Sequence, residues 1–125
     1  LMKTVYVFSR NVGFLGIVMD FMTGKVHEKI SSGKIWKITR HIYHIAAPDI
    51  LVIDSDPSDP GSLGGSDLVG FTQEVINDYP KIWILVFGPK EMAIHFQANP
   101  SALFVNRDHG LDSLLRHLET LIAMR

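Results

Sequence analysis

Two spacings of apolar residues alternate along the chain. Short stretches rich in apolar residues predict strands, and each is followed by a stretch in which apolar residues recur every three or four positions, typical of one face of a helix. The predicted strands are approximately residues 4–8, 26–30, 50–53, 82–87 and 102–105. The predicted helices are approximately residues 14–22, 34–46, 67–79, 90–97 and 111–124.

This alternation of strands and helices predicts the fold class. Short connections between alternating strands and helices favour a parallel sheet with helices on both faces. The continuous apolar runs at residues 50–53 and 82–87 are typical of strands buried on both faces, whereas the weaker run at residues 26–30 belongs at or near an edge. We therefore predict an α/β fold, a single doubly wound five-stranded parallel sheet with the flavodoxin-like strand order 2-1-3-4-5.

Composition narrows the range of functions. The 125 residues contain no cysteine, which excludes disulfides and thiolate catalysis, and the formal net charge of -1 gives no basic patch for direct contact with nucleic acid. No apolar run is long enough to cross a membrane and no signal peptide is present, so we expect a cytoplasmic protein. The apolar helical pattern of residues 121–125 stops without a cap, which suggests a domain followed by a C-terminal output module in a longer protein.

A polar loop follows the central predicted strand. Residues 55–66 are rich in Pro, Gly, Ser and Asp, and they lie at the carboxyl end of the strand, where open α/β folds place their chemistry. Asp54, Asp56 and Asp59 form either a metal-binding loop or a turn whose side chains bind nearby backbone N–H groups. His41 and His44, three residues apart on a predicted helix, are a second candidate pair of metal ligands.

Four segments resemble the response-regulator receiver domain of two-component signalling, in order and in spacing. They are Pro-Asp-Ile-Leu-Val-Ile-Asp at residues 48–54, Tyr-Pro-Lys-Ile-Trp-Ile-Leu-Val at 79–86, and the segments 99–105 and 110–115. The resemblance implies that Asp54 matches the phosphoacceptor. It also implies an acidic pair after the first strand that holds Mg²⁺, a Ser or Thr after the fourth strand, and a Lys after the fifth.

The chain departs from this pattern at every supporting position. The acidic pair would fall among Phe8, Ser9 and Arg10, where no carboxylate is present, and the hydroxyl position falls on Phe87. Asn106 replaces the lysine and Arg107 the proline that follows it. The sequence therefore resembles a degenerate receiver, or pseudo-receiver, with no catalytic residue, no metal and no cofactor.

Asp54 still needs a partner, because a buried carboxylate without a counter-charge or hydrogen bonds is costly. Arg10, just after the first predicted strand, is the first candidate for that cation, and Arg107 is the second.

An interaction surface is also implied by the resemblance, since receivers commonly pair through their fourth helix, fifth strand and fifth helix. Residues two apart on a helix lie on different faces, so we expect at least one of Met92, Ile94 and Phe96 at the surface. The other residues expected there are Leu103, Phe104, Arg116 and Glu119. The predicted partner is a second copy of the chain or an output domain of the same chain.

Three interpretations of function follow. The first is a non-enzymatic signalling domain of a response regulator that acts by protein–protein contact. The second is a working receiver, phosphorylated at Asp54 by a histidine kinase and dependent on Mg²⁺. The third is a metal-dependent phosphatase of the haloacid-dehalogenase type, because Asp-Ser-Asp follows an apolar strand; the position of that strand late in the chain disfavours it.

Overall fold

The structure is a computed structural model that describes residues 2–31 and 48–124. The predicted helix at residues 34–46, and with it His41 and His44, lies outside the described residues.

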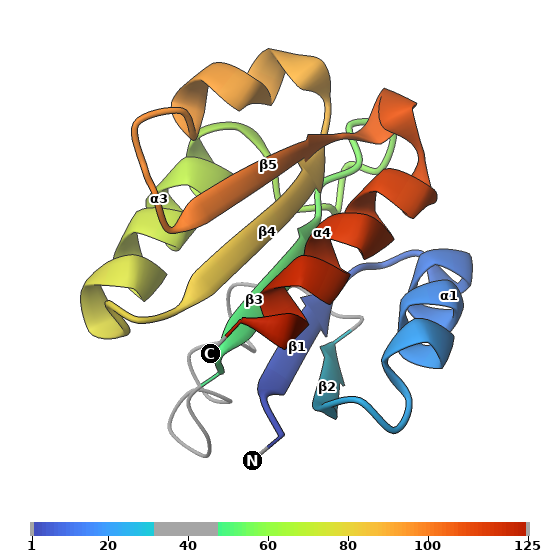
Figure 1. Ribbon diagram of the computed structural model, residues 1–125. Helices are drawn as coiled ribbons and strands as arrows, with labels where there is room; N and C mark the ends of the chain where they lie inside the picture. Colours follow the sequence, from blue (N-terminus) through green and yellow to red (C-terminus); the bar gives the residue numbers. More distant parts are fainter. Residues whose placement is uncertain (1, 32–47, 125) are drawn as a thin grey trace.

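The described strands form one parallel sheet in the order β2-β1-β3-β4-β5 (Figure 1). The strands are β1 (Thr4–Phe8), β2 (His27–Ser31), β3 (Ile50–Asp54), β4 (Trp83–Gly88) and β5 (Ala102–Asn106). The helices are α1 (Val12–Met22), α3 (Gly65–Asp78) and α4 (Leu111–Ala123), with 3₁₀ helices η1 (Lys90–His95) and η2 (Arg107–His109). The prediction of an α/β fold, with helices packed on both faces of a parallel sheet, is confirmed.

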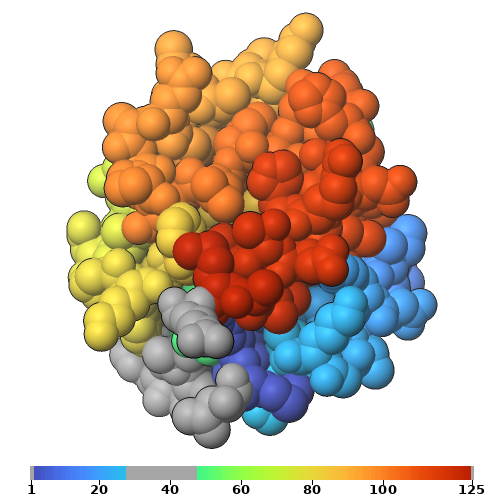
Figure 2. Space-filling model, in the orientation of Figure 1, coloured from blue at the N-terminus to red at the C-terminus, as the bar shows by residue number. Residues whose placement is uncertain are grey.

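The sheet separates two hydrophobic cores, because successive side chains of a strand point to opposite faces. On one face, alternate strand residues such as Val7, Val52 and Val105 pack against α1 and α4. On the other face their neighbours, such as Phe8 and Ile53, pack against α3 and the residues around η1. In Figure 2 the side chains of α4, in red, cover much of the sheet that Figure 1 shows behind them.

Three helices begin or end at other residues than the sequence pattern predicts. Asn11 precedes α1, and its Oδ1 accepts a hydrogen bond from the Phe14 N–H at 3.0 Å, so the helix starts at Val12. Helix α3 starts at Gly65, whose φ of +57° lies in the left-handed region that favours glycine. The segment predicted as a helix at residues 90–97 is the shorter 3₁₀ helix η1, a form used in short pieces.

The helices of the described residues are too short or too polar to cross a membrane.

Candidate functional site

The side chains of three strand ends meet at the carboxyl edge of the sheet. Val7, Val52 and Val105 share the face covered by α1 and α4, and two residues further along come Ser9, Asp54 and Arg107. Because side chains alternate along a strand, this spacing directs those three toward the same side of the sheet. Strand pairing aligns Asp54 with Phe87 and Phe87 with Val105, so β4 lies between Asp54 and β5, the strand that Arg107 directly follows.

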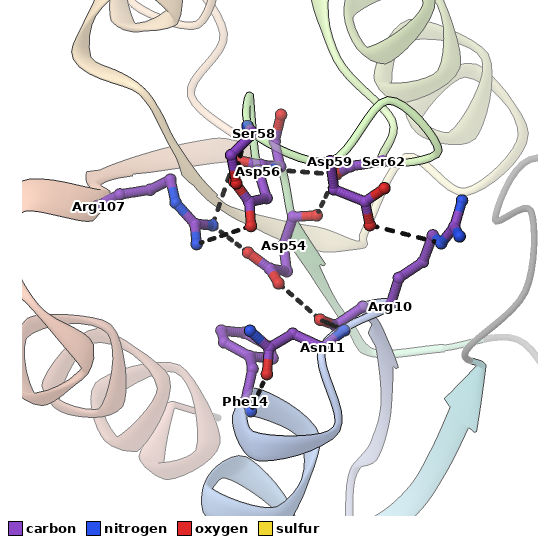
Figure 3. A network of polar contacts seen from close by, with 11 residues as sticks. Arg10, Asn11, Phe14, Asp54, Asp56, Ser58, Asp59, Ser62 and Arg107 are labelled. Carbon is purple, nitrogen blue, oxygen red and sulfur yellow. Dashed lines mark hydrogen bonds and ion pairs between the residues drawn. The ribbon is translucent and has the colours of Figure 1, made fainter.

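Asp54 is buried, with 2% of its surface exposed, and both of its carboxylate oxygens have partners (Figure 3). Ser9 Oγ donates to Asp54 Oδ2 at 2.5 Å, and Ser9 is itself fully buried. Arg107 Nη1 donates to Asp54 Oδ1 in a charge-assisted hydrogen bond. The buried negative charge is therefore neutralised by a cation of the chain itself.

Arg107 has further contacts around the carboxylate. Its Nη1 lies 3.2 Å from the carbonyl oxygen of Ser55, and its Nη2 lies 3.8 Å from Asp56 Oδ2. The guanidinium carbon is 4.9 Å from the centroid of the Phe87 ring, a cation–π distance. Thus Phe87, at the position where the resemblance implies a hydroxyl, supports the guanidinium group that holds Asp54.

The expectation that Arg10 would be the first partner of Asp54 is wrong. Arg10 shares the strand parity of Phe8, not of Ser9, and its Nε lies 3.4 Å from Asp59 Oδ2 (Figure 3). Its side chain, 41% exposed, occupies the space that a side chain at Gly61 would need. Arg10 therefore ties the end of β1 to the loop after β3 and leaves Asp54 to Arg107.

The acidic residues of the loop bind their own neighbours. Asp56 Oδ1 accepts hydrogen bonds from Ser58 N at 2.9 Å and from Ser58 Oγ at 2.7 Å, and Asp59 Oδ1 accepts one from Gly61 N at 2.9 Å. The Ser58 hydroxyl and N–H, followed by the Arg107 charge, lower the pKa of Asp56 below its usual value of 3.8. This geometry is the turn that the sequence offered as the alternative to a metal loop.

The residues at this edge do not fit the Mg²⁺ site that the resemblance implies. Mg²⁺ takes near-octahedral oxygen ligands and is usually held by one or two carboxylates. Phe8 is a core residue, Ser9 donates its hydroxyl hydrogen to Asp54, and Arg10 brings a positive charge. Among the described residues no group of three or more His, Cys, Asp or Glu side chains is placed to hold a metal ion.

Two residues of the edge have roles that the sequence did not reveal. Ser9 was assigned only as a missing acid, yet it is the second hydrogen-bond donor to Asp54. Ser9 continues the alternation of Val5 and Val7, which face the opposite side of the sheet from Tyr6 and Phe8. This alternation is the signal in the sequence that could have indicated its role. Asn106 Oδ1 accepts a hydrogen bond from Asp108 N at 2.9 Å and so caps η2, the turn that begins with Arg107.

The predicted interaction surface separates into exposed and buried residues. Ile94 is 69% exposed, Met92 is partly buried, and Phe96 is 4% exposed. The Phe96 ring stacks on Phe104 with centroids 6.0 Å apart. Leu103 packs on the opposite core, while Arg116 and Glu119 on α4 are exposed.

Comparison of the sequence with protein-family models and with curated proteins finds no match. Among solved structures, a response regulator from Thermotoga maritima superposes with a TM-score of 0.74 at 15% identity, covering 99% of this chain and 100% of that one. The Vibrio cholerae chemotaxis protein CheY4 gives 0.71 at 12% identity, with 97% and 99% covered. An orphan response regulator of H. pylori gives 0.72 at 12% identity, with 96% of each chain covered.

The chain has the receiver fold. The superposition extends over nearly the whole chain, as the four sequence segments suggested. Some proteins with this fold are longer: the chain covers 53% of the T. maritima response regulator DrrB and 27% of NtrX from Brucella abortus.

Proposed function

We propose that the chain is a receiver-type signalling module that acts through contact with other proteins, without Mg²⁺-dependent phosphorylation of Asp54 and without enzymatic activity. The observation that carries this proposal is the occupied carboxylate: Arg107 holds one oxygen of Asp54 and Ser9 holds the other. The receiver fold, shared with solved response regulators, supports the signalling role.

The chemistry of phosphoryl transfer explains why this arrangement opposes phosphorylation. A carboxylate oxygen must attack the phosphorus while cations neutralise the charge gathering on the phosphoryl oxygens. Here both oxygens are hydrogen-bonded, and the nearest cation is already paired with the carboxylate. Phe87 and Asn106 supply neither the hydroxyl nor the ammonium group that would hold the phosphoryl oxygens.

Incubation with acetyl phosphate and Mg²⁺, followed by intact mass spectrometry, tests the proposal. We expect no mass change in the wild-type chain. We also expect no mass change in Arg107→Ala. Even after the guanidinium is removed, the end of β1 has no carboxylate that could hold Mg²⁺. A phosphorylatable receiver treated in parallel controls for the reagents.

The second candidate is a receiver that is phosphorylated at Asp54 by a histidine kinase. It is favoured by the position of Asp54 at the end of the central strand β3, beside the loop of residues 55–64. Stoichiometric addition of one phosphoryl group, abolished by Asp54→Asn, would establish this candidate and contradict the first.

The surface that we propose for protein contact is the one formed by η1, β5 and α4. Ile94 is its most exposed large apolar side chain, and Arg116 and Glu119 are exposed charges on the neighbouring helix. The proposed partner is a second copy of the chain or an output domain, because large exposed apolar side chains are favourable anchors for contact.

A further inference from the structure

A cavity of about 290 Å³ lies between η1, β5 and α4, and neither Asp54 nor Arg107 lines it. Its apolar wall consists of Ala93, Phe104 and Val105. Its polar lining consists of Lys90, Asn106, His109, Ser113 and His117. No carboxylate lines the cavity, although the chain contains 13 Asp and Glu residues.

Two of the polar lining side chains have a hydrogen bond that fixes how the group is oriented. Asn106 uses its Oδ1 to accept from Asp108 N, which leaves the NH₂ of its amide for other partners. His117 Nδ1 lies 2.7 Å from the Ser113 carbonyl oxygen, so this nitrogen carries a proton, because a carbonyl only accepts. In the neutral ring the other nitrogen, Nε2, is therefore an acceptor, and only the imidazolium form donates from it.

Ser113 supplies an independent indication of a ligand. The residue is only 8% exposed and lines the cavity, yet its hydroxyl has no hydrogen-bond partner within residues 2–31 and 48–124. A buried hydroxyl without a partner is costly, and such groups usually bind water or a ligand.

The N-terminus of α4 lies beside the cavity, because Ser113 near the start of this helix lines it. Gly110 is the N-cap residue of this 13-residue helix and provides no side-chain cap, and Ser113 lies in the first turn. The free N–H groups of a helix start carry partial positive charge and favour anions. Asp108 and Asp112 are close in sequence but are exposed and do not line the cavity.

We propose that this cavity binds a small oxyanion, a carboxylate or a phosphate. Lys90 provides the full positive charge, while the Ser113 hydroxyl and the Asn106 amide provide hydrogen bonds to the oxygens. The apolar wall of Phe104 and Ala93 excludes water from one side of the ligand. The proposal does not depend on whether Asp54 accepts a phosphoryl group.

Amide chemical shifts measured by NMR during a titration with inorganic phosphate test the proposal, with ionic strength held constant by NaCl. We expect saturable shifts at residues 106–117 and at Lys90. A parallel titration with acetate distinguishes the two kinds of oxyanion. In Lys90→Gln the affinity should fall about fivefold or more, because a charge-assisted hydrogen bond is lost. Ser113→Ala should weaken binding about threefold or more.

Lys81→Gln is the matched control, because Lys81 is an exposed lysine that precedes β4, whereas Lys90 follows the opposite end of the same strand. Its affinity should equal that of the wild-type chain. Saturable binding of phosphate or acetate that is weakened by Lys90→Gln and Ser113→Ala supports the proposal. Shifts no larger than those in NaCl alone, or equal affinities in all variants, would overturn it.

Discussion

At the scale of single residues, the main feature of the site is the buried carboxylate of Asp54. Its desolvation must be offset by partners, and the structure supplies a cation from η2, directly after β5, and a hydroxyl from the residue after β1. Arg107 can do this because it is 23% exposed and its guanidinium rests on the Phe87 ring. Asp54 is thus held by an ion pair with Arg107 and a hydrogen bond from Ser9.

Arg107→Met should lower the free energy of unfolding by about 2–4 kcal/mol, because it leaves the Asp54 charge buried with Ser9 as its remaining partner. Urea unfolding followed by circular dichroism measures this loss. In the double variant Asp54→Asn with Arg107→Met the loss should be smaller than the sum of the two single losses, by about 1–3 kcal/mol.

Arg10→Met provides the matched control for that experiment. The Arg10–Asp59 pair is 41% and 30% exposed, so solvent screens it and its removal should cost less than about 1 kcal/mol. Equal losses in the free energy of unfolding for Arg10→Met and Arg107→Met would show that the buried Asp54–Arg107 pair stabilises the fold no more than an exposed ion pair.

At the scale of elements, the segment between β3 and α3 is organised by its own polar side chains. Asp56 binds Ser58, and Asp59 binds Gly61. Ser62 Oγ donates to the Asp54 carbonyl oxygen at 3.1 Å and accepts from Asp56 N at 2.9 Å. These bonds hold the loop beside Arg10 and Arg107, so the loop and the two arginines position each other.

Ser58→Ala should raise the pKa of Asp56 toward 3.8, because the serine hydroxyl is the largest cause of its lowering. A carboxyl group whose pKa is lowered in the folded state stabilises the fold above its unfolded pKa, and that contribution is lost as the pH falls through the lowered value. The stability difference between wild type and Ser58→Ala should therefore be present at neutral pH and shrink below pH 3.8.

Carbon-detected NMR titration of the Asp56 carboxyl group, with unfolding curves at several pH values, measures both effects. Ser66→Ala is the control, because Ser66 is an exposed serine in the first turn of α3. An Asp56 pKa that is the same in wild type and Ser58→Ala would contradict the assigned cause.

At the scale of the whole molecule, large exposed apolar side chains lie over both faces of the sheet. Helix α1 exposes Val12, at 82%, and Ile17 on the face that it shares with α4. The 3₁₀ helix η1 exposes Ile94 on the other face, next to β5 at the edge of the sheet. Ile94 can therefore be substituted without altering the hydrophobic core or the Asp54 site.

Ile94→Asp should weaken self-association about tenfold or more if the chain pairs through η1, β5 and α4, because an apolar anchor is replaced by a charge. Analytical ultracentrifugation in the micromolar range measures the effect. Phe96→Asp is unsuitable, because Phe96 is buried and a charge there would disrupt the core.

Val12→Asp serves as the control, since it adds the same charge to an exposed apolar position on α1, which is not one of the elements of the proposed surface. Its association should match that of the wild type. A monomeric wild-type chain at these concentrations would exclude the homodimer, and an equal effect of both substitutions would exclude the proposed surface.

The sequence by itself indicated the five strands, the helices α1, α3 and α4, and the position of Asp54. Runs such as residues 50–53 predict buried strands because a strand covered on both faces has no polar position, and the residue after such a run lies at the functional edge of a parallel sheet. The helix starts next to Asn11 and at Gly65 did not follow from the apolar pattern. A cap or a left-handed residue depends on backbone geometry that apolar periodicity does not encode.

Only the tertiary structure decided which arginine holds Asp54. Arg10 comes two residues after the neighbouring strand β1, but its side chain points to the loop after β3, where Gly61 leaves space and Asp59 offers a carboxylate. Arg107 reaches Asp54 across β4 because the register of β3, β4 and β5 aligns Asp54, Phe87 and Val105. Such a contact joins residues 53 positions apart, and the strand register that sets it arises from packing rather than from local sequence.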